Sequence, residues 1–338
     1  MDLTKQKVSI ALCVFNGEDF LRGQLDSIAM QTRRPDELIV CDDGSEDRTL
    51  EIIADFAKTV DFPIRINVNK SHLGITKNFQ KAVELCVGDI IFLSDQDDFW
   101  FSKKIDTVCK VFSENPEAGY VFSDAWVVNQ ELLFDGTLWA RVGFLNKRYA
   151  HFSGSNQFES LFKSNFIYGN TLAFRGVHKK VLIPFDSKSS DFTHDVWISR
   201  VLSGADIRGI GIQDCLICYR QHSRQVASAG AYFKKSFFEK VQAVLRETRA
   251  ADSRAELICD LKSLKSRLCK VSPHKISNIK YLDELIMHLE HRNVISSIKI
   301  SRFYKFKLVL EETLRGRYKR FSSSCLSALL DSMLCLGF

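Results

Sequence analysis

The first part of the chain alternates between short apolar runs and longer segments with apolar residues at helical spacing. Residues 8–15 form a largely apolar run that ends at the turn pair Asn16-Gly17. This pattern is typical of a buried strand followed by a turn. Residues 19–31 then place apolar side chains at the spacing of one helix face, so a strand followed by a helix is predicted.

The same alternation continues to residue 123. It predicts strands at 37–41, 63–68, 89–94 and 119–123, with helices at 46–60, 74–86 and 101–113 between them. Strands that alternate with helices of this length form βαβ crossovers. We therefore expect an α/β fold with a doubly wound, mostly parallel sheet. Later strands are predicted at 166–174 and 215–219.

Beyond residue 230 the strand pattern gives way to helical periodicity. It runs from Phe233 to Leu245 and again from Leu282 to Leu289, with Pro273 between the two groups. A chain of 338 residues more often forms two unequal units than one domain. We expect a catalytic domain over residues 1–230 and a helical tail over residues 231–338.

The charge differs between these two parts. Residues 231–338 contain 21 Lys and Arg against 11 Asp and Glu, which leaves 26 against 30 for residues 1–230. A basic tail suggests an anionic surface such as a membrane or nucleic acid. A solvated helical face that keeps the protein soluble would explain the same charge.

Composition narrows the class of protein. The chain is 45% hydrophobic and 26% charged, which argues against a disordered, collagen-like or coiled-coil protein. Its ten cysteines lie mostly in apolar runs, as reduced, buried thiols of a cytosolic protein would. No apolar run reaches about 18 residues, so no spanning helix is expected. The polar start, Met1 to Lys7, predicts no signal peptide.

Acidic or turn residues follow three of the predicted strands. They are Asn16-Gly17-Glu18-Asp19, Asp42-Asp43-Gly44-Ser45 and Ser94-Asp95-Gln96-Asp97-Asp98. Parallel strands place their carboxyl ends at one edge, so these loops should converge. Clustered carboxylates repel one another unless a cation, hydrogen-bond donors or raised pKa values relieve the repulsion. Oxygen ligands suit Mg²⁺ or Mn²⁺, which also bind substrate phosphates.

A simpler alternative exists for one of these loops. Asp42-Asp43-Gly44-Ser45 also fits a turn with a helix cap. The loop at residues 95–98 is the stronger candidate, because a capping turn needs one Asp and this loop offers three. The chain has neither a GxGxxG motif after its first strand nor a GxxxxGK[ST] motif. A Rossmann dinucleotide site and a P-loop are therefore not supported, and metal-bridged diphosphate binding remains.

Four motifs in this order resemble the family 2 glycosyltransferases, which have the nucleotide-sugar-binding GT-A fold. They are VSIALCVFNGEDFL, ELIVCDDGSEDRT, NKSHLGITKNFQKA and GDIIFLSDQDDFW, and the resemblance covers roughly residues 7–225. Within this family the chain is similar to bacterial rhamnosyltransferases of cell-surface polysaccharide assembly. The residues that carry this similarity are 95–100 (DQDDFW), 194–197 (HDVW) and 219–222 (YRQH).

The resemblance implies roles in donor binding. Asp43 would accept a hydrogen bond from the ring NH of a uracil or thymine base, and the backbone near Cys13 and Phe15 would line the base pocket. Asp95 would bind the ribose. Free NH groups and Lys77, at the start of the third predicted helix, would face the base or phosphates; an ordinary helix start is the alternative there.

The resemblance also implies a divalent cation, Mg²⁺ or Mn²⁺, at the diphosphate. Asp97 is the better candidate for its ligand, and Asp98 could exchange roles with it because the Asp is doubled. His222 would bind the metal or the diphosphate, although a lone surface histidine is the common explanation for such a residue. Arg220 would clamp the diphosphate.

Asp195 is the expected catalytic base of an inverting transfer. The alternative for Asp195 is a carboxylate that faces a helix dipole at the N-terminus. Aromatic residues between 125 and 192, such as Trp139 and Phe152, would form either the floor of an acceptor site or part of the core.

We therefore expect a metal-dependent glycosyltransferase that transfers a sugar, most simply rhamnose, from a dTDP or UDP donor. The acceptor would be a saccharide, either free or lipid-linked. No nucleic acid is expected as a partner. A sugar nucleotidyltransferase and a non-enzymatic, membrane-associated scaffold are the rival hypotheses. The tail would lie at the inner face of the membrane as a basic amphipathic helix, or form a helical bundle or oligomer contact.

Overall fold

The computed structural model describes residues 6–154, 157–189, 192–223, 225, 251–297, 300–322 and 326–336. The chain divides into two compact units, one of Met1–Phe185 with Thr193–Ala231 and one of Asp186–Phe192 with Tyr232–Phe338. The helical pattern expected from Phe233 to Leu245 lies outside the described residues.

The short segment Asp186–Phe192 departs from the expected division, because it belongs to the second unit. The carboxylate of Asp260 accepts hydrogen bonds from the backbone NH groups of Lys188 and Ser189, at 2.7 and 2.9 Å. Asp260 lies on α11 (Ala251–Val271). These bonds to a distant helix give no signal in the local sequence pattern.

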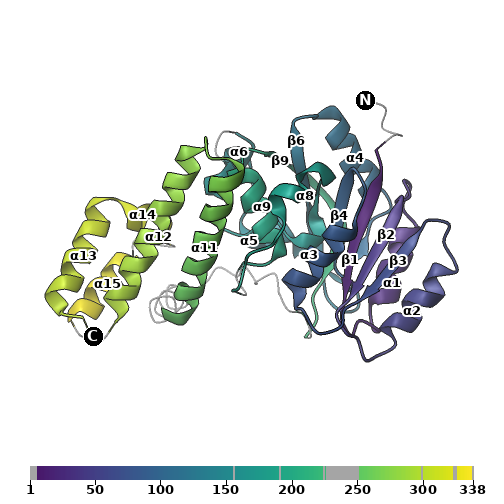
Figure 1. Ribbon diagram of the computed structural model, residues 1–338, viewed down its shortest axis with the longest axis horizontal. Helices are drawn as coiled ribbons and strands as arrows, with labels where there is room; N and C mark the ends of the chain where they lie inside the picture. Colours follow the sequence, from purple (N-terminus) through teal and green to yellow (C-terminus); the bar gives the residue numbers. More distant parts are fainter. Residues whose placement is uncertain are drawn as a thin grey trace. The chain divides into compact units, whose positions relative to one another are not determined.

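The first half of the sheet is parallel. Its strands are β1 (Val8–Val14), β2 (Glu37–Asp42), β3 (Ile64–Val68) and β4 (Ile90–Ser94), in the spatial order β3-β2-β1-β4. The connecting helices are α1 (Leu21–Ala29), α2 (Thr49–Ala57) and α3 (Ile75–Leu85). The chain reverses direction across the sheet after β3, so α1 and α2 lie on one side of these strands and α3 on the other (Figure 1).

The second half of the sheet is mixed, although most strands of the whole sheet run in one direction, as expected. β8 (Leu172–Arg175) pairs antiparallel with both β4 and β6 (Ala118–Val128). Beyond it, β6 pairs parallel with β9 (Arg208–Arg220), which pairs antiparallel with β5 (Phe99–Trp100). β7 (Phe134–Thr137) adds an antiparallel pairing to β6. The α/β class is as expected, but the antiparallel insertion of β8 changes the second half.

Helices and turns surround this mixed half. They are α4 (Lys104–Glu114), α5 (Leu138–Val142), α6 (Lys147–Ser153), α7 (Gln157–Ser160), α8 (Lys179–Leu182), α9 (His194–Gly204), and the 3₁₀ turns η2 (Gly169–Thr171) and η3 (Gly176–His178). The strand predicted at 166–174 is shortened by η2, which ends directly before β8.

Aromatic side chains fill the core between β6 and the short helices. Phe122, Trp139, Phe144 and Phe152 are buried, and the rings of Phe144 and Phe166 stack at 3.7 Å. These residues therefore belong to the core, the simpler of the two alternatives for the aromatics of this region.

The second unit is helical. With α11 it contains α12 (Ile276–Ser296), α13 (Arg302–Leu314), α14 (Arg317–Phe321) and α15 (Leu326–Leu336). Ile295, Leu308, Val309, Tyr318 and Cys335 form a buried cluster. In the described part of the chain, every helix is too short or too polar to cross a membrane.

Candidate functional site

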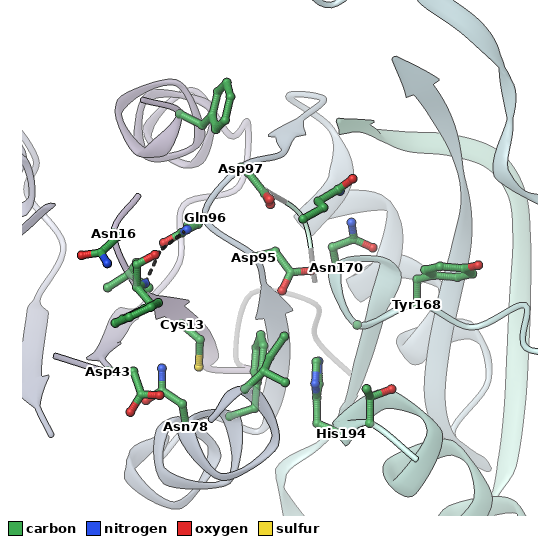
Figure 2. A pocket seen from close by; sticks show the side chains of 18 of the residues that line it. Cys13, Asn16, Asp43, Asn78, Asp95, Gln96, Asp97, Tyr168, Asn170 and His194 are labelled. Carbon is green, nitrogen blue, oxygen red and sulfur yellow. Dashed lines mark hydrogen bonds between the residues drawn. The ribbon is translucent and has the colours of Figure 1, made fainter. Parts of the chain in front are cut away.

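A pocket of about 630 Å³ opens where β1, β2 and β4 end, a volume typical of small-molecule sites. Asp43, Asp95 and Asp97 all line it, so the loops that follow the parallel strands converge as predicted. Figure 2 shows Asp95 and Asp97 at one side of the hollow and Asp43 near Cys13 and Asn78. The turn η2, the first turn of α9, helix α3 and the end of β9 with the residues after it supply the other walls.

The two acidic residues at the end of β2 have different tasks. Asp42 accepts hydrogen bonds from the backbone NH groups of Gly44 and Ser45, at 3.1 and 3.0 Å, and so stabilises the turn. Asp43 lines the pocket and is only 3% exposed. Its carboxylate accepts from the NH groups of Leu73 and Gly74, at 2.8 and 2.9 Å. The turn hypothesis thus fits Asp42, and the site hypothesis fits Asp43.

The wall around Asp43 combines rings and amides. Phe15 is half-exposed at the pocket, and its ring centroid lies 4.8 Å from that of His72. Gln96 occupies both backbone groups of Phe15, with N to Oε1 at 2.8 Å and Nε2 to O at 3.0 Å. The ring of Phe15, rather than its backbone, is therefore what a ligand would meet. Cys13 lies at the base of the same wall.

The expectation for Lys77 needs correction. Its Nζ donates to the carbonyl of Phe185 at 2.6 Å and to Oε1 of Gln80 at 3.0 Å, and Lys77 does not line the pocket. Asn78 lines it instead, with Nδ2 donating to the Cys41 carbonyl at 2.9 Å. Ile75, Asn78 and Phe79 line the pocket and share one face of α3. At about 100° per residue, Lys77 lies on the opposite face.

The acidic loop after β4 divides in the same way. Asp95 and Asp97 line the pocket, whereas Asp98 is fully buried away from it. The Asp98 carboxylate accepts from Nδ2 of Asn170 and, at 3.2 Å, from the backbone NH of Arg220. The proposed exchange of roles between Asp97 and Asp98 is thus disfavoured, because internal hydrogen bonds occupy Asp98.

Burial and mutual repulsion raise the pKa values in this loop. Burial, followed by the charge of Asp97, raises the pKa of Asp98 to about 8. Burial and the charges of Asp98, Asp97 and Asp195 raise the pKa of Asp95 well above its usual range. A bound cation would relieve this repulsion.

Asp97 and His222 meet at the pocket wall. Nε2 of His222 lies 2.8 Å from Oδ2 of Asp97, and both residues line the pocket. Among the described residues, no three His, Cys, Asp or Glu side chains are grouped so as to hold a metal ion. One carboxylate and one imidazole nevertheless fit Mg²⁺ or Mn²⁺, since such ions often complete their shell with water and substrate phosphates.

The expectation for Arg220 also needs correction. Its Nε donates to the backbone carbonyl of Asp97 at 2.9 Å, Nη1 donates to the carbonyl of Gln130, and the residue is absent from the pocket lining. β5 and the end of β9 pair at Phe99 and Cys218, which places Arg220 behind the acidic loop. Arg220 therefore holds the loop in position and does not reach the pocket.

Asp195 lies in the first turn of α9 and lines the pocket. Its Oδ1 accepts from the backbone NH of Val196 at 2.8 Å and from Oγ1 of Thr193, and its Oδ2 accepts from the NH of Gly169 at 3.1 Å. The carboxylate therefore lies at a helix N-terminus and at the pocket at once, a position that either of the two roles requires.

His194 is a pocket residue to which the sequence analysis gave no role. Asn170 also lines the pocket, where the pair Gly169-Asn170 was expected to allow close approach to a donor sugar. His194 is 4% exposed, stacks on Phe79 at 3.8 Å, and has no hydrogen-bond partner for either ring nitrogen. Burial lowers its pKa, so the ring is neutral at pH 7. Oδ1 of Asn170 is likewise buried without a partner. Unsatisfied buried polar atoms are costly, and three such atoms in two residues of one pocket favour a ligand there.

Gly169 shows why the turn before Asn170 has this sequence. A Cβ atom at this position would lie 2.3 Å from Nε2 of His194. Glycine is therefore required for the turn to pack against the histidine. The pairs Gly169-Asn170 and His194-Asp195 were visible in the sequence, but their contact depends on the tertiary fold.

Two bacterial proteins are similar in sequence to about two thirds of this chain. A 236-residue stretch is 23% identical to an uncharacterized protein of Mycobacterium tuberculosis, which is 69% of this chain and 64% of that protein's length. A 221-residue stretch is 24% identical to the Escherichia coli glucosyltransferase WfaP, covering 65% of this chain and 80% of that protein. The chain thus spans less than two thirds of the mycobacterial relative.

A solved structure shares the fold. Staphylococcus aureus TarS 1-349, solved in complex with UDP-GlcNAc, superposes with a TM-score of 0.51 at 15% identity, over 94% of this chain and 89% of that one. This likeness supports the expected GT-A-like architecture. The sequence profile described as "Glycosyl transferase family 2" matches residues 9–182, more than half of the chain. The chain belongs to glycosyl transferase family 2.

Proposed function

We propose that this protein is an inverting glycosyltransferase that transfers a sugar from a nucleoside diphosphate donor to a saccharide acceptor. The observation that carries this proposal is one pocket with three chemically different parts. Asp43 and Asn78 lie in one part, Asp97 and His222 in the second, and Asp195 in the third. These parts fit a base, a diphosphate and an acceptor hydroxyl, respectively.

The nucleoside would bind beside Asp43. The ring pair of Phe15 and His72 offers a stacking surface, and the Asp43 carboxylate, held by Leu73 and Gly74, is positioned to accept from a ring NH of a uracil or thymine. Asp95 would accept from the ribose hydroxyls. Because Asp43 is held by backbone NH groups, its orientation is fixed before the donor binds.

The diphosphate would lie at Asp97 and His222. A divalent cation held by these residues would neutralise the diphosphate and stabilise it as a leaving group. Arg220 supports the site from behind, because its bond to the Asp97 carbonyl holds the loop.

The sugar would lie beside Asn170 and His194. The unpartnered Oδ1 of Asn170 can accept a hydrogen bond from a sugar hydroxyl, and the neutral imidazole of His194 can donate or accept one. A sugar hydroxyl would therefore satisfy polar atoms that otherwise remain buried without partners.

Asp195 would take the proton from the acceptor hydroxyl. The acceptor oxygen forms the new bond to the anomeric carbon while the bond from that carbon to the diphosphate breaks, and the proton passes to a carboxylate oxygen of Asp195. The bonds from Gly169 and Val196 hold the carboxylate in one orientation, which favours a single direction of attack.

The donor and acceptor are finer parts of the proposal. We propose dTDP-rhamnose as the first donor to test, with UDP sugars second, and synthesis of a surface polysaccharide as the process. The name of WfaP describes transfer from UDP-Glc to a diphosphoundecaprenol-linked acceptor. This relative supports a lipid-linked saccharide as the acceptor class to test here.

Donor binding and transfer together test the proposal. Nucleoside diphosphates and their sugars should raise the melting temperature, more strongly with Mg²⁺ or Mn²⁺, and the best of them should be consumed when a saccharide acceptor is added. Nucleotide binding that ignores metal, without transfer to any acceptor, would favour the scaffold hypothesis. Release of pyrophosphate from a nucleoside triphosphate and a sugar phosphate would favour a nucleotidyltransferase.

A further inference from the structure

Helix α13 carries an apolar stripe on its outer side. Phe303, Phe306, Leu310 and Leu314 are 84%, 53%, 50% and 78% exposed. Their spacing of three and four residues places them on one face of the helix. The stripe extends for about 16 Å along the axis. We call Phe303, Phe306, Leu310 and Leu314 the α13 stripe.

The inner face of the same helix is more polar than the stripe. Leu308 and Val309 pack into the core of the unit, but Lys305 and Glu312 are buried beside them, at 7% and 0% exposed. A helix that serves only its own core shows the reverse pattern, with apolar residues inside and charges outside. Folding of this unit therefore does not explain the apolar character of the α13 stripe.

Basic side chains lie close to the stripe along the chain. Lys307 is exposed and lies one turn after Phe303, and exposed Arg302 directly precedes Phe303. Lys319 is exposed on α14, whereas Arg315 pairs with Glu311 and Arg320 with Glu284. An apolar stripe bordered by cations matches an anionic lipid surface, where apolar side chains enter the acyl boundary and lysines reach the headgroups.

We propose that the α13 stripe is the surface by which this protein binds an anionic bilayer, with the helix in the plane of the interface. A bilayer fits better than a second copy of the chain. A two-fold contact centred on the stripe would bring the Lys307 side chains of both copies together, and interface cores are poor in lysine. The proposal rests on the proposed function only for its purpose, which is to bring the enzyme to a lipid-linked acceptor.

Sedimentation of the full chain with lipid vesicles tests this surface. Vesicles of phosphatidylcholine with phosphatidylglycerol should bind the protein, and vesicles of phosphatidylcholine alone should bind it more weakly. The double substitution Phe303→Ser with Leu314→Ser should weaken binding by about 100-fold, because the variant no longer buries two large apolar side chains in the bilayer. Lys307→Glu should weaken it by about tenfold, less at high salt.

Matched controls are available in the same unit. Ile276, at the start of α12, is 71% exposed, and Lys280 is exposed on the same helix. Ile276→Ser and Lys280→Glu should leave vesicle binding within about twofold of the unsubstituted chain, since surface changes outside a binding face have small effects.

Three results would overturn the proposal. They are failure of the unsubstituted chain to bind phosphatidylglycerol vesicles, full binding by the Phe303→Ser, Leu314→Ser variant, and a dimer in solution that this variant converts to a monomer. Donor consumption with a water-soluble acceptor separates this proposal from the proposed function. If the Phe303→Ser, Leu314→Ser variant loses vesicle binding but still consumes the donor, the result concerns the stripe alone. If the unsubstituted chain binds vesicles but consumes no donor, the result contradicts only the proposed function.

Discussion

Each unit of the chain buries a group of charged side chains, and the two groups differ in their charge balance. In the second unit Glu312 is fully buried and contacts His288, His291 and Arg317. Burial raises the pKa of Glu312, but the hydrogen bonds from His288, Arg317 and His291 outweigh this and lower it to about 2. The partners within this group therefore stabilise the charge of the Glu312 carboxylate.

The group in the first unit is not balanced in this way. Asp95, Asp97 and Asp98 follow one another around a single loop, and the pKa values of Asp95 and Asp98 are raised by burial and by like charge. Lys104 is buried beside them, but its Nζ donates to the Asn170 carbonyl, and burial lowers its pKa to about 7. Balanced charges are typical of a structural group, whereas an excess of carboxylates at a pocket is what the proposed cation site requires.

Asp195→Asn should have the largest effect on the reaction. Removal of a general base typically costs roughly 10²–10⁴-fold in rate, while donor binding should change little. Steady-state transfer and donor titration measure the two effects separately. Asp106 lies in the first turn of α4 and is exposed, so Asp106→Asn is the matched control for a carboxylate that serves only a helix N-terminus. Equal activity of both variants would exclude Asp195 as the base.

Glu312→Gln should have the largest effect on stability. It removes the charge that His288, His291 and Arg317 share, and breaking a buried ion pair costs about 3–5 kcal/mol. Hydrogen exchange should report faster opening of α12 and α13, with little change in β1 and β4. Glu311→Gln is the control, because Glu311 pairs with exposed Arg315 and such pairs contribute at most about 1 kcal/mol. Equal effects of the two substitutions would contradict the structural role.

Asp97→Asn should impair donor binding and spare stability, whereas Glu312→Gln should impair stability. The Asp97 substitution should lower metal-supported donor affinity by about 10–100-fold without lowering the melting temperature of the free protein, because it removes one of several repelling charges. Isothermal titration with and without Mg²⁺ measures the affinity. Asp98→Asn should instead reduce stability and keep the metal dependence, since Asp98 bonds to Asn170 and Arg220. The reverse result would exchange the two assignments.

The parallel half of the sheet could be predicted because its signals are local. β1, β2 and β4 are buried along their full length, and each is a largely apolar run in the sequence. The position of β8 could not be predicted, because its pairing with β4 and β6 depends on residues far apart in the chain. An antiparallel partner leaves no mark on the pattern of a strand that is buried on both faces.

The site shows the same limit at the level of single side chains. Asp43, Asp95 and Asp97 could be placed because the edge of a parallel sheet is a property of the fold class. Lys77 and Arg220 could not, because the rotation of α3 and the pairing of β9 with β5 decide where they point. His194 was visible next to Asp195, but the absence of any hydrogen-bond partner for its ring becomes evident only when the surrounding elements are assembled.

The smallest expected effect is the loss of stability of the second unit at acid pH. The folded pKa of Glu312, about 2, lies below the ordinary value of about 4.3 in the unfolded chain. The stabilisation is therefore complete above about pH 5 and is lost as the pH falls toward 2. Between pH 7 and pH 4 this carboxyl should account for a loss of less than about 1 kcal/mol. Urea unfolding followed through hydrogen exchange of α12 and α13 measures it. The Glu312→Gln variant should lack this component, and an unchanged pH dependence in that variant would assign the effect to other groups.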